Sequence, residues 1–179
     1  TFSNELEHLE ALLAAAASST TNKKIGYSYY EIRQCLRQIQ AFVMREEGER
    51  LYEEEENEAE VTRDLMKLLT LNYEYDDPMT AEMMNILIPR AAELISCHSG
   101  NLNTEQLTNL LSRILYFIQE PEQLPPFLDS LLALLNQHLT PSRLPEVLDD
   151  NDLDCWIALQ YFLNGQRQSV ENVAHLSIR

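Results

Sequence analysis

The stretch from Thr104 to Leu139 constrains this chain most, because it has the pattern of two neighbouring helices that are too apolar to stand alone in water. Its first half repeats apolar residues at the spacing of one helix face. We expect Thr104 to cap this helix and Pro121 to end it, since a proline disfavours the helical conformation in the residue before it. The residues of the stripe are Leu107, Leu110, Leu111, Ile114, Leu115 and Ile118.

The second half is predicted to open at Pro125-Pro126, where a missing N–H is harmless in the first turn of a helix. Its apolar residues fall on two overlapping stripes, so a neighbour on one side is not enough to cover them. We therefore predict that this helix is an interior layer. The residues expected to be nearly inaccessible are Leu111, Leu115, Leu131, Leu135 and Trp156.

The rest of the chain is predicted to be helical too. Only four glycines occur in 179 residues, and leucine dominates the apolar positions, which favours helices over a many-stranded sheet. Ser28 and Glu31 match a capping box that would start a helix after a polar loop at 18–26. Asp77-Pro78 would start another, in which Pro89 implies a kink or a break. The parts of this single domain, 1–179, are an amino-terminal helix at 1–17, an acidic, partly flexible segment at 46–60, a repeat-like helical core at 61–165 and a tail at 166–179.

The acidic segment ends in the block Glu53, Glu54, Glu55 and Glu56, whose like charges repel one another. We interpret the segment as a frayed helix end or a loop. The block is either a solvated face or an electrostatic docking site for a basic segment, and tyrosines around it, such as Tyr52, are either packing residues or binding anchors.

The formal charge of −16 excludes some partners and favours others. Binding to the phosphates of a nucleic acid needs a clustered basic face, so we expect no direct nucleic-acid partner, whereas a basic peptide would be attracted. No transmembrane run is visible, and we expect no membrane partner. Cys35, Cys97 and Cys155 are far apart, which suits free thiols in an intracellular protein, cytoplasmic or nuclear.

No pattern in the sequence indicates catalysis, a cofactor or a metal. His8, His98, His138 and His175 are dispersed and have no ligand-spaced partner. The Cys97-His98 pair would bind zinc only with two ligands from elsewhere, and the simpler interpretation is a thiol beside an imidazole at a helix end. We expect a protein that is not an enzyme.

Helix pairs are predicted to start near Val61, Thr104 and Thr140, roughly every 40 residues, with short proline-containing connections. The proline-proline entry at Leu124-Pro125-Pro126-Phe127-Leu128, the leucine-rich helix after it and Pro89 carry a resemblance over about residues 60–165. On these residues the chain resembles armadillo and HEAT repeats. The fold class expected is all-α, as an armadillo/HEAT-like right-handed helical array or an irregular bundle of about seven to eight helices.

The resemblance implies a scaffold or adaptor that grips a peptide or helix of a partner protein along a concave surface of inner helices. The residues that we expect on this surface are Arg90, Asn136, Gln137, Gln160 and Asn164. The alternative is a homo-oligomerisation or structural domain of a larger protein, including a homodimer. A further alternative is a regulatory domain whose glutamate block masks a basic region of its own parent chain.

Overall fold

The computed structural model describes residues 1–18, 22–54, 57–71, 77–119 and 124–147. Within these ranges the chain forms eight helices and no strand, which confirms the all-α class. The armadillo or HEAT arrangement stays a prediction. The helices are α1 (Phe2–Ser18), α2 (Asn22–Val43), α3 (Glu46–Glu54), α4 (Glu58–Leu69), α5 (Pro78–His98), α6 (Thr104–Ile118), α7 (Leu128–His138) and α8 (Leu144–Val147).

The chain divides into two compact units, Thr1–His98 and Ser99–Arg179. The first holds α1 to α5, and the second holds α6 to α8 in its described part. The division falls inside the segment 61–165 that the sequence suggested as one repeat-like core. A single domain over 1–179 stays a prediction.

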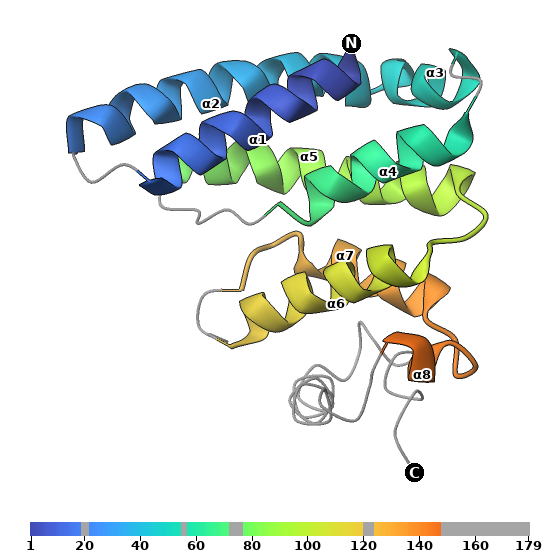
Figure 1. The fold of residues 1–179 in the computed structure, drawn as a ribbon. Coiled ribbons are helices and arrows are strands. Elements are labelled where there is room, and N and C mark those ends of the chain that lie inside the picture. The colour runs from blue at the N-terminus through green and yellow to red at the C-terminus, as the bar shows by residue number, and fades with distance from the viewer. Residues whose placement is uncertain (19–21, 55–56, 72–76, 120–123, 148–179) are drawn as a thin grey trace. The chain divides into compact units, whose positions relative to one another are not determined.

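In the first unit α1 and α4 lie in one layer and α2 and α5 lie behind them (Figure 1). The helices α2 and α5 run parallel. Arg33 in the middle of α2 contacts Asp77 at the start of α5, and Val43 at the end of α2 contacts Arg90 in the middle of α5. The short helix α3 packs against α2, α4 and α5. The apolar core between the layers includes Leu6, Leu9, Ile32, Leu36, Ile39, Leu65, Leu68, Leu87, Ile88 and Ile95.

Two helices of this unit begin where the sequence did not place them. The helix α2 begins at Asn22, so residues 22–26 of the predicted polar loop are helical and Ser28 is not the start of the helix. Lysine and isoleucine tolerate the helix well, and one glycine costs it only about 1 kcal/mol, so Gly26 does not stop it. The acidic segment holds α3 and the start of α4, whose cap is Asn57.

The start of α5 is as predicted: Asp77 accepts from the Thr80 backbone N–H at 3.1 Å and from the Thr80 hydroxyl at 2.6 Å. Its carboxylate also pairs with Arg33 of α2 at 2.7 Å, which ties the two parallel helices together. The helix continues through Pro89 without a break. A proline removes only one backbone hydrogen bond from the helix. The packing of the buried residues on both sides of Pro89 offsets this loss and keeps the helix continuous.

In the second unit α6 packs against α7 and α8. Asn103, not Thr104, caps α6, in a capping box with Gln106. The helix α7 begins at Leu128, after a turn in which the Leu128 N–H donates to the Pro125 carbonyl at 3.1 Å, so Pro125-Pro126 precede the helix rather than open it.

The burial of two leucines on α7 is as predicted, while the place of α7 as an interior layer covered from more than one side stays a prediction. Leu131 and Leu135 are fully inaccessible, and Leu111 of α6 is 4% exposed, as predicted. Leu115 is only partly buried, and the predicted position of Trp156 lies outside the described residues. The buried face of α6 includes Arg113 and Phe117 rather than Leu115. The guanidinium carbon of Arg113 lies 4.7 Å from the ring centroid of Tyr116 and 4.4 Å from that of Phe117. An arginine stem and its guanidinium can cover aromatic faces, which the apolar pattern alone does not predict.

Candidate functional site

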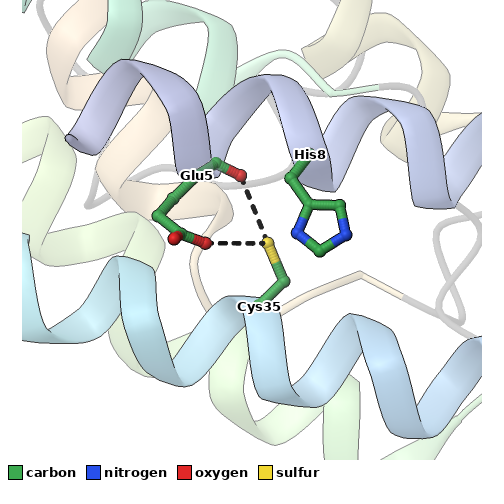
Figure 2. Close-up of side chains that lie close together, drawn as sticks. All are labelled: Glu5, His8 and Cys35. Carbon is green, nitrogen blue, oxygen red and sulfur yellow. Dashed lines mark hydrogen bonds between the residues drawn. The ribbon is translucent and has the colours of Figure 1, made fainter.

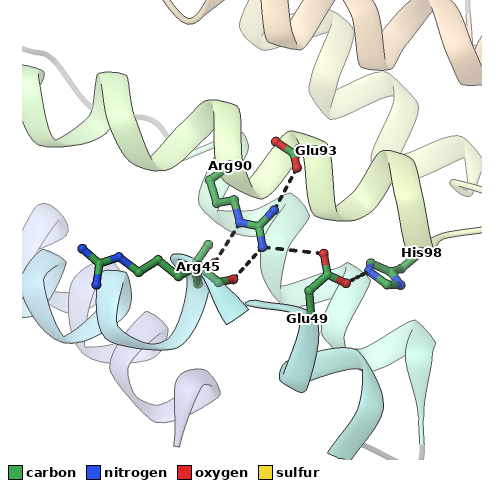
Figure 3. A network of polar contacts seen from close by, with 6 residues as sticks. Arg45, Glu49, Arg90, Glu93 and His98 are labelled. Atoms are coloured by element: carbon green, nitrogen blue, oxygen red, sulfur yellow. Dashed lines mark hydrogen bonds and ion pairs between the residues drawn. The ribbon is translucent and has the colours of Figure 1, made fainter. Parts of the chain in front are cut away.

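Arg90, the first residue predicted to bind a partner, lies at the junction of α2, α3 and α5 (Figure 3). Its Nε donates to the Val43 carbonyl at 3.3 Å and its Nη2 to the Arg45 carbonyl at 2.7 Å. The same guanidinium pairs with Glu93 at 2.9 Å and with Glu49 at 3.6 Å. All these contacts lie within the first unit, so they give Arg90 a structural role, and a role in binding stays a prediction.

Glu49 extends this network from Arg90 to the end of α5. Its second carboxylate oxygen contacts Nε2 of His98, and the imidazole stacks on the ring of Tyr52 with centroids 4.7 Å apart. Tyr52 is half-buried, its hydroxyl lies 2.9 Å from the Thr62 hydroxyl, and burial raises its pKa to about 12. Tyr52 therefore packs between helices. His98 contacts Glu49, and its sequence neighbour Cys97 is exposed.

The other residues predicted for binding are not all described. Asn136 is half-buried and Gln137 is exposed on α7 of the second unit, while Gln160 and Asn164 lie outside the described residues. In the acidic block, Glu53 is exposed near the end of α3 and Glu54 ends it, whereas Glu55 and Glu56 lie outside the described residues. Arg90 belongs to the first unit and the two α7 residues to the second.

A feature that sequence reasoning missed is an exposed apolar face on α5. Met79 is 56% exposed and Ile86 is 53% exposed. They are seven residues apart and so lie on one face of the helix, with the partly buried Met83 between them in sequence. Glu82 and Glu93 are exposed on the same side. The apolar pattern of the sequence places Met79, Met83, Ile86, Leu87, Leu94 and Ile95 on one stripe. The structure buries Leu87, Leu94 and Ile95 as that pattern predicts, but it leaves Met79 and Ile86 exposed and uses Met84, Ile88 and Ala91 in the core instead.

A second missed cluster joins α1 and α2 (Figure 2). Glu5 and His8 lie one turn apart on α1, and the buried Cys35 of α2 points between them. The Cys35 thiol donates to the Glu5 backbone carbonyl at 3.2 Å, and its sulfur lies 3.9 Å from the Glu5 carboxylate. Burial, with the negative charge of Glu5, raises the pKa of Cys35 to about 11. Without a cation nearby this thiol stays protonated at neutral pH, so it is not poised as a nucleophile.

A small apolar crevice in the first unit has a cavity volume of only about 10 Å³, roughly the space of one water molecule. Pockets for drug-sized ligands are larger, about 300–1,000 Å³, and hold a few polar groups that fix the ligand. This crevice has almost no polar lining, so it does not indicate a small-molecule site. It is lined by Leu9, Leu13, Ile32, Leu36, Leu71, Thr80 and Met84.

The chain matches no protein-family model, no curated protein and no solved structure. Among the helices of the described ranges, none is both long and apolar enough to cross a membrane.

Proposed function

We propose that this chain is a protein–protein interaction module, a scaffold or adaptor, that binds a helix or peptide of basic character from a partner protein. The observation that carries the proposal is the exposed face of α5, where Met79 and Ile86 each leave more than half of their surface in water. Exposed apolar side chains that share one helix face are the kind of surface that binds an apolar helix face of a partner.

The size of this face fits an amphipathic helix. Met79 and Ile86 are seven residues apart, which is about 10 Å along the axis of α5. A partner helix with apolar residues at i, i+4 and i+7 spans the same length. Binding would remove both side chains from water at about 25 cal/mol for each Å² of apolar surface.

The charges beside this face favour a basic partner. Glu82 and Glu93 are exposed next to Met79 and Ile86, and the whole chain carries a formal charge of −16. A partner with lysines or arginines beside its apolar stripe would pair with Glu82 and be attracted from a distance by the net negative charge. A second copy of this chain would bring the same negative charge, which disfavours the homo-oligomeric alternative.

The proposed module acts by binding rather than by catalysis, and we propose that it is intracellular. The glutamate block Glu53–Glu56 would speed the approach of the basic partner. Asn136 and Gln137 on α7, and Gln160 and Asn164 later in the sequence, remain proposed as polar contacts of the second unit with a partner.

The experiment uses two synthetic peptides of identical composition. One is a helix with leucines at i, i+4 and i+7 flanked by lysines, and the other has the same residues in scrambled order. Fluorescence anisotropy with the full chain should show binding of the striped peptide, weakened at least about tenfold by Met79→Ser with Ile86→Ser. The matched control is Tyr116→Ser on α6, which removes an exposed aromatic residue, 43% accessible, from the second unit.

Equal binding of the two peptides would reduce the interaction to bulk charge and refute the proposed face. Equal affinity of wild type and the α5 double variant would refute it too. Light scattering tests the alternative directly, because a dimer that Ile86→Ser dissociates would assign the face to self-association. Changing Glu53–Glu56 to glutamine should slow association and flatten its salt dependence, while changing Asn136 or Gln137 should raise the dissociation rate.

A further inference from the structure

We propose that Glu5, His8 and Cys35 form a binding site for a divalent metal ion of the zinc class, which links α1 to α2. The carboxylate, the imidazole and the thiol each offer one ligand atom, and these atoms all lie within 4.8 Å of one another (Figure 2). The inference is independent of the α5 face, which lies on another helix.

The three donor atoms fit one class of metal. Sulfur, imidazole nitrogen and carboxylate oxygen are the ligands of Zn²⁺ in proteins, whereas Ca²⁺ and Mg²⁺ prefer oxygen alone. A thiolate among the ligands selects zinc and similar borderline metals. The three donor atoms therefore favour a zinc-class metal, although the sequence holds no zinc-binding motif.

The distances need only a small adjustment. A tetrahedral zinc ion with a sulfur ligand at about 2.3 Å and an oxygen or nitrogen ligand at about 2.0 Å separates those two ligands by roughly 3.5 Å. The sulfur of Cys35 already lies 3.9 Å from a carboxylate oxygen of Glu5. His8 is exposed, so its ring can turn toward the other two ligands without displacing the core.

The charge balance also suits a dication. On binding, the Cys35 thiol releases its proton to solvent, so that the sulfur bonds the metal as a thiolate. One thiolate and one carboxylate then neutralise the two positive charges, and the imidazole binds through a neutral nitrogen. Because His8 is at the surface, a water molecule can take the fourth position.

Such an ion would stabilise the packing of the first unit. Glu5 and His8 come from α1, whose first residues pack against the end of α2 through Phe2 and Phe42, with ring centroids 6.1 Å apart. Cys35 comes from the middle of α2. A metal bond between the two helices would hold them together beyond what their apolar contact supplies.

The test uses the full chain with Cys97→Ser and Cys155→Ser, so that Cys35 is the only thiol. The metal-free protein is titrated with Co²⁺ and then with Zn²⁺. We expect one equivalent of Co²⁺ to bind with an intense thiolate-to-cobalt band and the visible spectrum of tetrahedral cobalt, and Zn²⁺ to displace it. Zn²⁺ should also raise the melting temperature.

Two single variants decide whether the three residues act together. His8→Gln and Glu5→Gln change accessible side chains and should each weaken the affinity by more than about tenfold, since loss of even an outer partner costs that much. Cys35→Ala should abolish the cobalt band. Far-UV circular dichroism checks that each variant is folded.

Absence of a thiolate band in the folded parent would overturn the proposal. A band that His8→Gln and Glu5→Gln leave at full affinity would overturn it too, because Cys35 would then bind cobalt as a single thiol.

Discussion

The guanidinium of Arg90 on α5 donates to the carbonyl of Val43, the last residue of α2, at 3.3 Å. The last carbonyls of a helix have no partner within it and need donors from elsewhere. Arg90 supplies two, since it also donates to the Arg45 carbonyl at 2.7 Å, and Arg45 itself has a left-handed φ of 57°. A side chain 45 residues away in sequence thus holds the turn from α2 into α3.

We expect Arg90→Ala to lower the free energy of unfolding by on the order of 2–3 kcal/mol, because two backbone carbonyls lose a charged donor. Arg90→Lys should lose more than half as much, since a lysine keeps the charge but not the planar fork that reaches both carbonyls. Urea unfolding followed by far-UV circular dichroism measures both changes.

The matched control is Arg63→Ala. The Arg63 side chain is 55% exposed and its contact with Asp64 is long, 3.8 Å, so the change should stay within about 0.5 kcal/mol. If Arg90→Ala were as mild as this control, the network would be a surface feature without structural weight.

Gly48→Ala tests the close approach of α3 to the same turn. A Cβ at this position would lie 2.2 Å from the Val43 carbonyl oxygen and 2.8 Å from a methyl carbon of Leu94. The backbone must move to accept it, so we expect a destabilisation of about 1–3 kcal/mol. Gly100→Ala, where a Cβ meets nothing within 4 Å, should be neutral or stabilise by up to about 1 kcal/mol. Equal effects in thermal unfolding would contradict the predicted clash.

The sequence predicted the helices well because their periodicity is local. The spacing of the leucines in α6 and α7 indicates which face of each helix is buried, and Asp77 before Pro78 predicts the start of α5. The predicted starts of α2 and α7 were wrong. A capping sequence at Ser28 or a proline pair at 125–126 permits a helix to start there but does not require it.

The candidate sites could not be predicted in the same way because they depend on contacts between distant residues. Arg90 stands out in sequence as a cation in an apolar helix, but only the fold brings the end of α2 to it. His8 and Cys35 are 27 residues apart, without a ligand spacing, and meet because α1 packs on α2. The rotation of α5 that exposes Ile86 is likewise set by its neighbours rather than by its own pattern.

Asp77 makes the stability of the first unit sensitive to acid. The Thr80 hydroxyl and, with it, Arg33 hold the pKa of Asp77 below the ordinary 3.8, although burial opposes them. The charged carboxylate therefore contributes stability that is complete above about pH 4 and is lost as the pH falls through the folded-state pKa. Asp77→Asn should cost about 1 kcal/mol at pH 7 and flatten the acid limb of the curve, measured by urea unfolding between pH 2 and pH 7.

Thr80→Val serves as the comparison, because it removes the hydroxyl that contributes most to this shift while keeping a similar shape. It should weaken the acid dependence without removing it, since Arg33 still pairs with the carboxylate. An Asp77→Asn variant with the same acid limb as the wild type would assign that dependence to other groups.

His138 gives the second unit a pH dependence at a higher pH. Its side chain at the end of α7 is 6% exposed, and its Nε2 has no hydrogen-bond partner among the described residues. Burial, and then the positive charge of Arg143, lower its pKa below the ordinary 6.5, so the folded state resists protonation. The unfolded chain binds the proton more readily, and the unfolding free energy should fall as the pH drops below about 6.5, by at most about 1.4 kcal/mol for each pH unit.

His138→Leu removes the titrating group and keeps an apolar side chain of similar size, so stability should vary less between pH 7 and pH 5. Arg143→Gln, which removes the nearby positive charge, should reduce the slope only in part, because burial is the larger cause. The measurement is urea unfolding at half-unit steps of pH, in a background of Asp77→Asn so that the acid limb of the first unit does not overlap. A slope that His138→Leu leaves unchanged would show that the imidazole accepts its proton in the folded state as easily as in the unfolded chain.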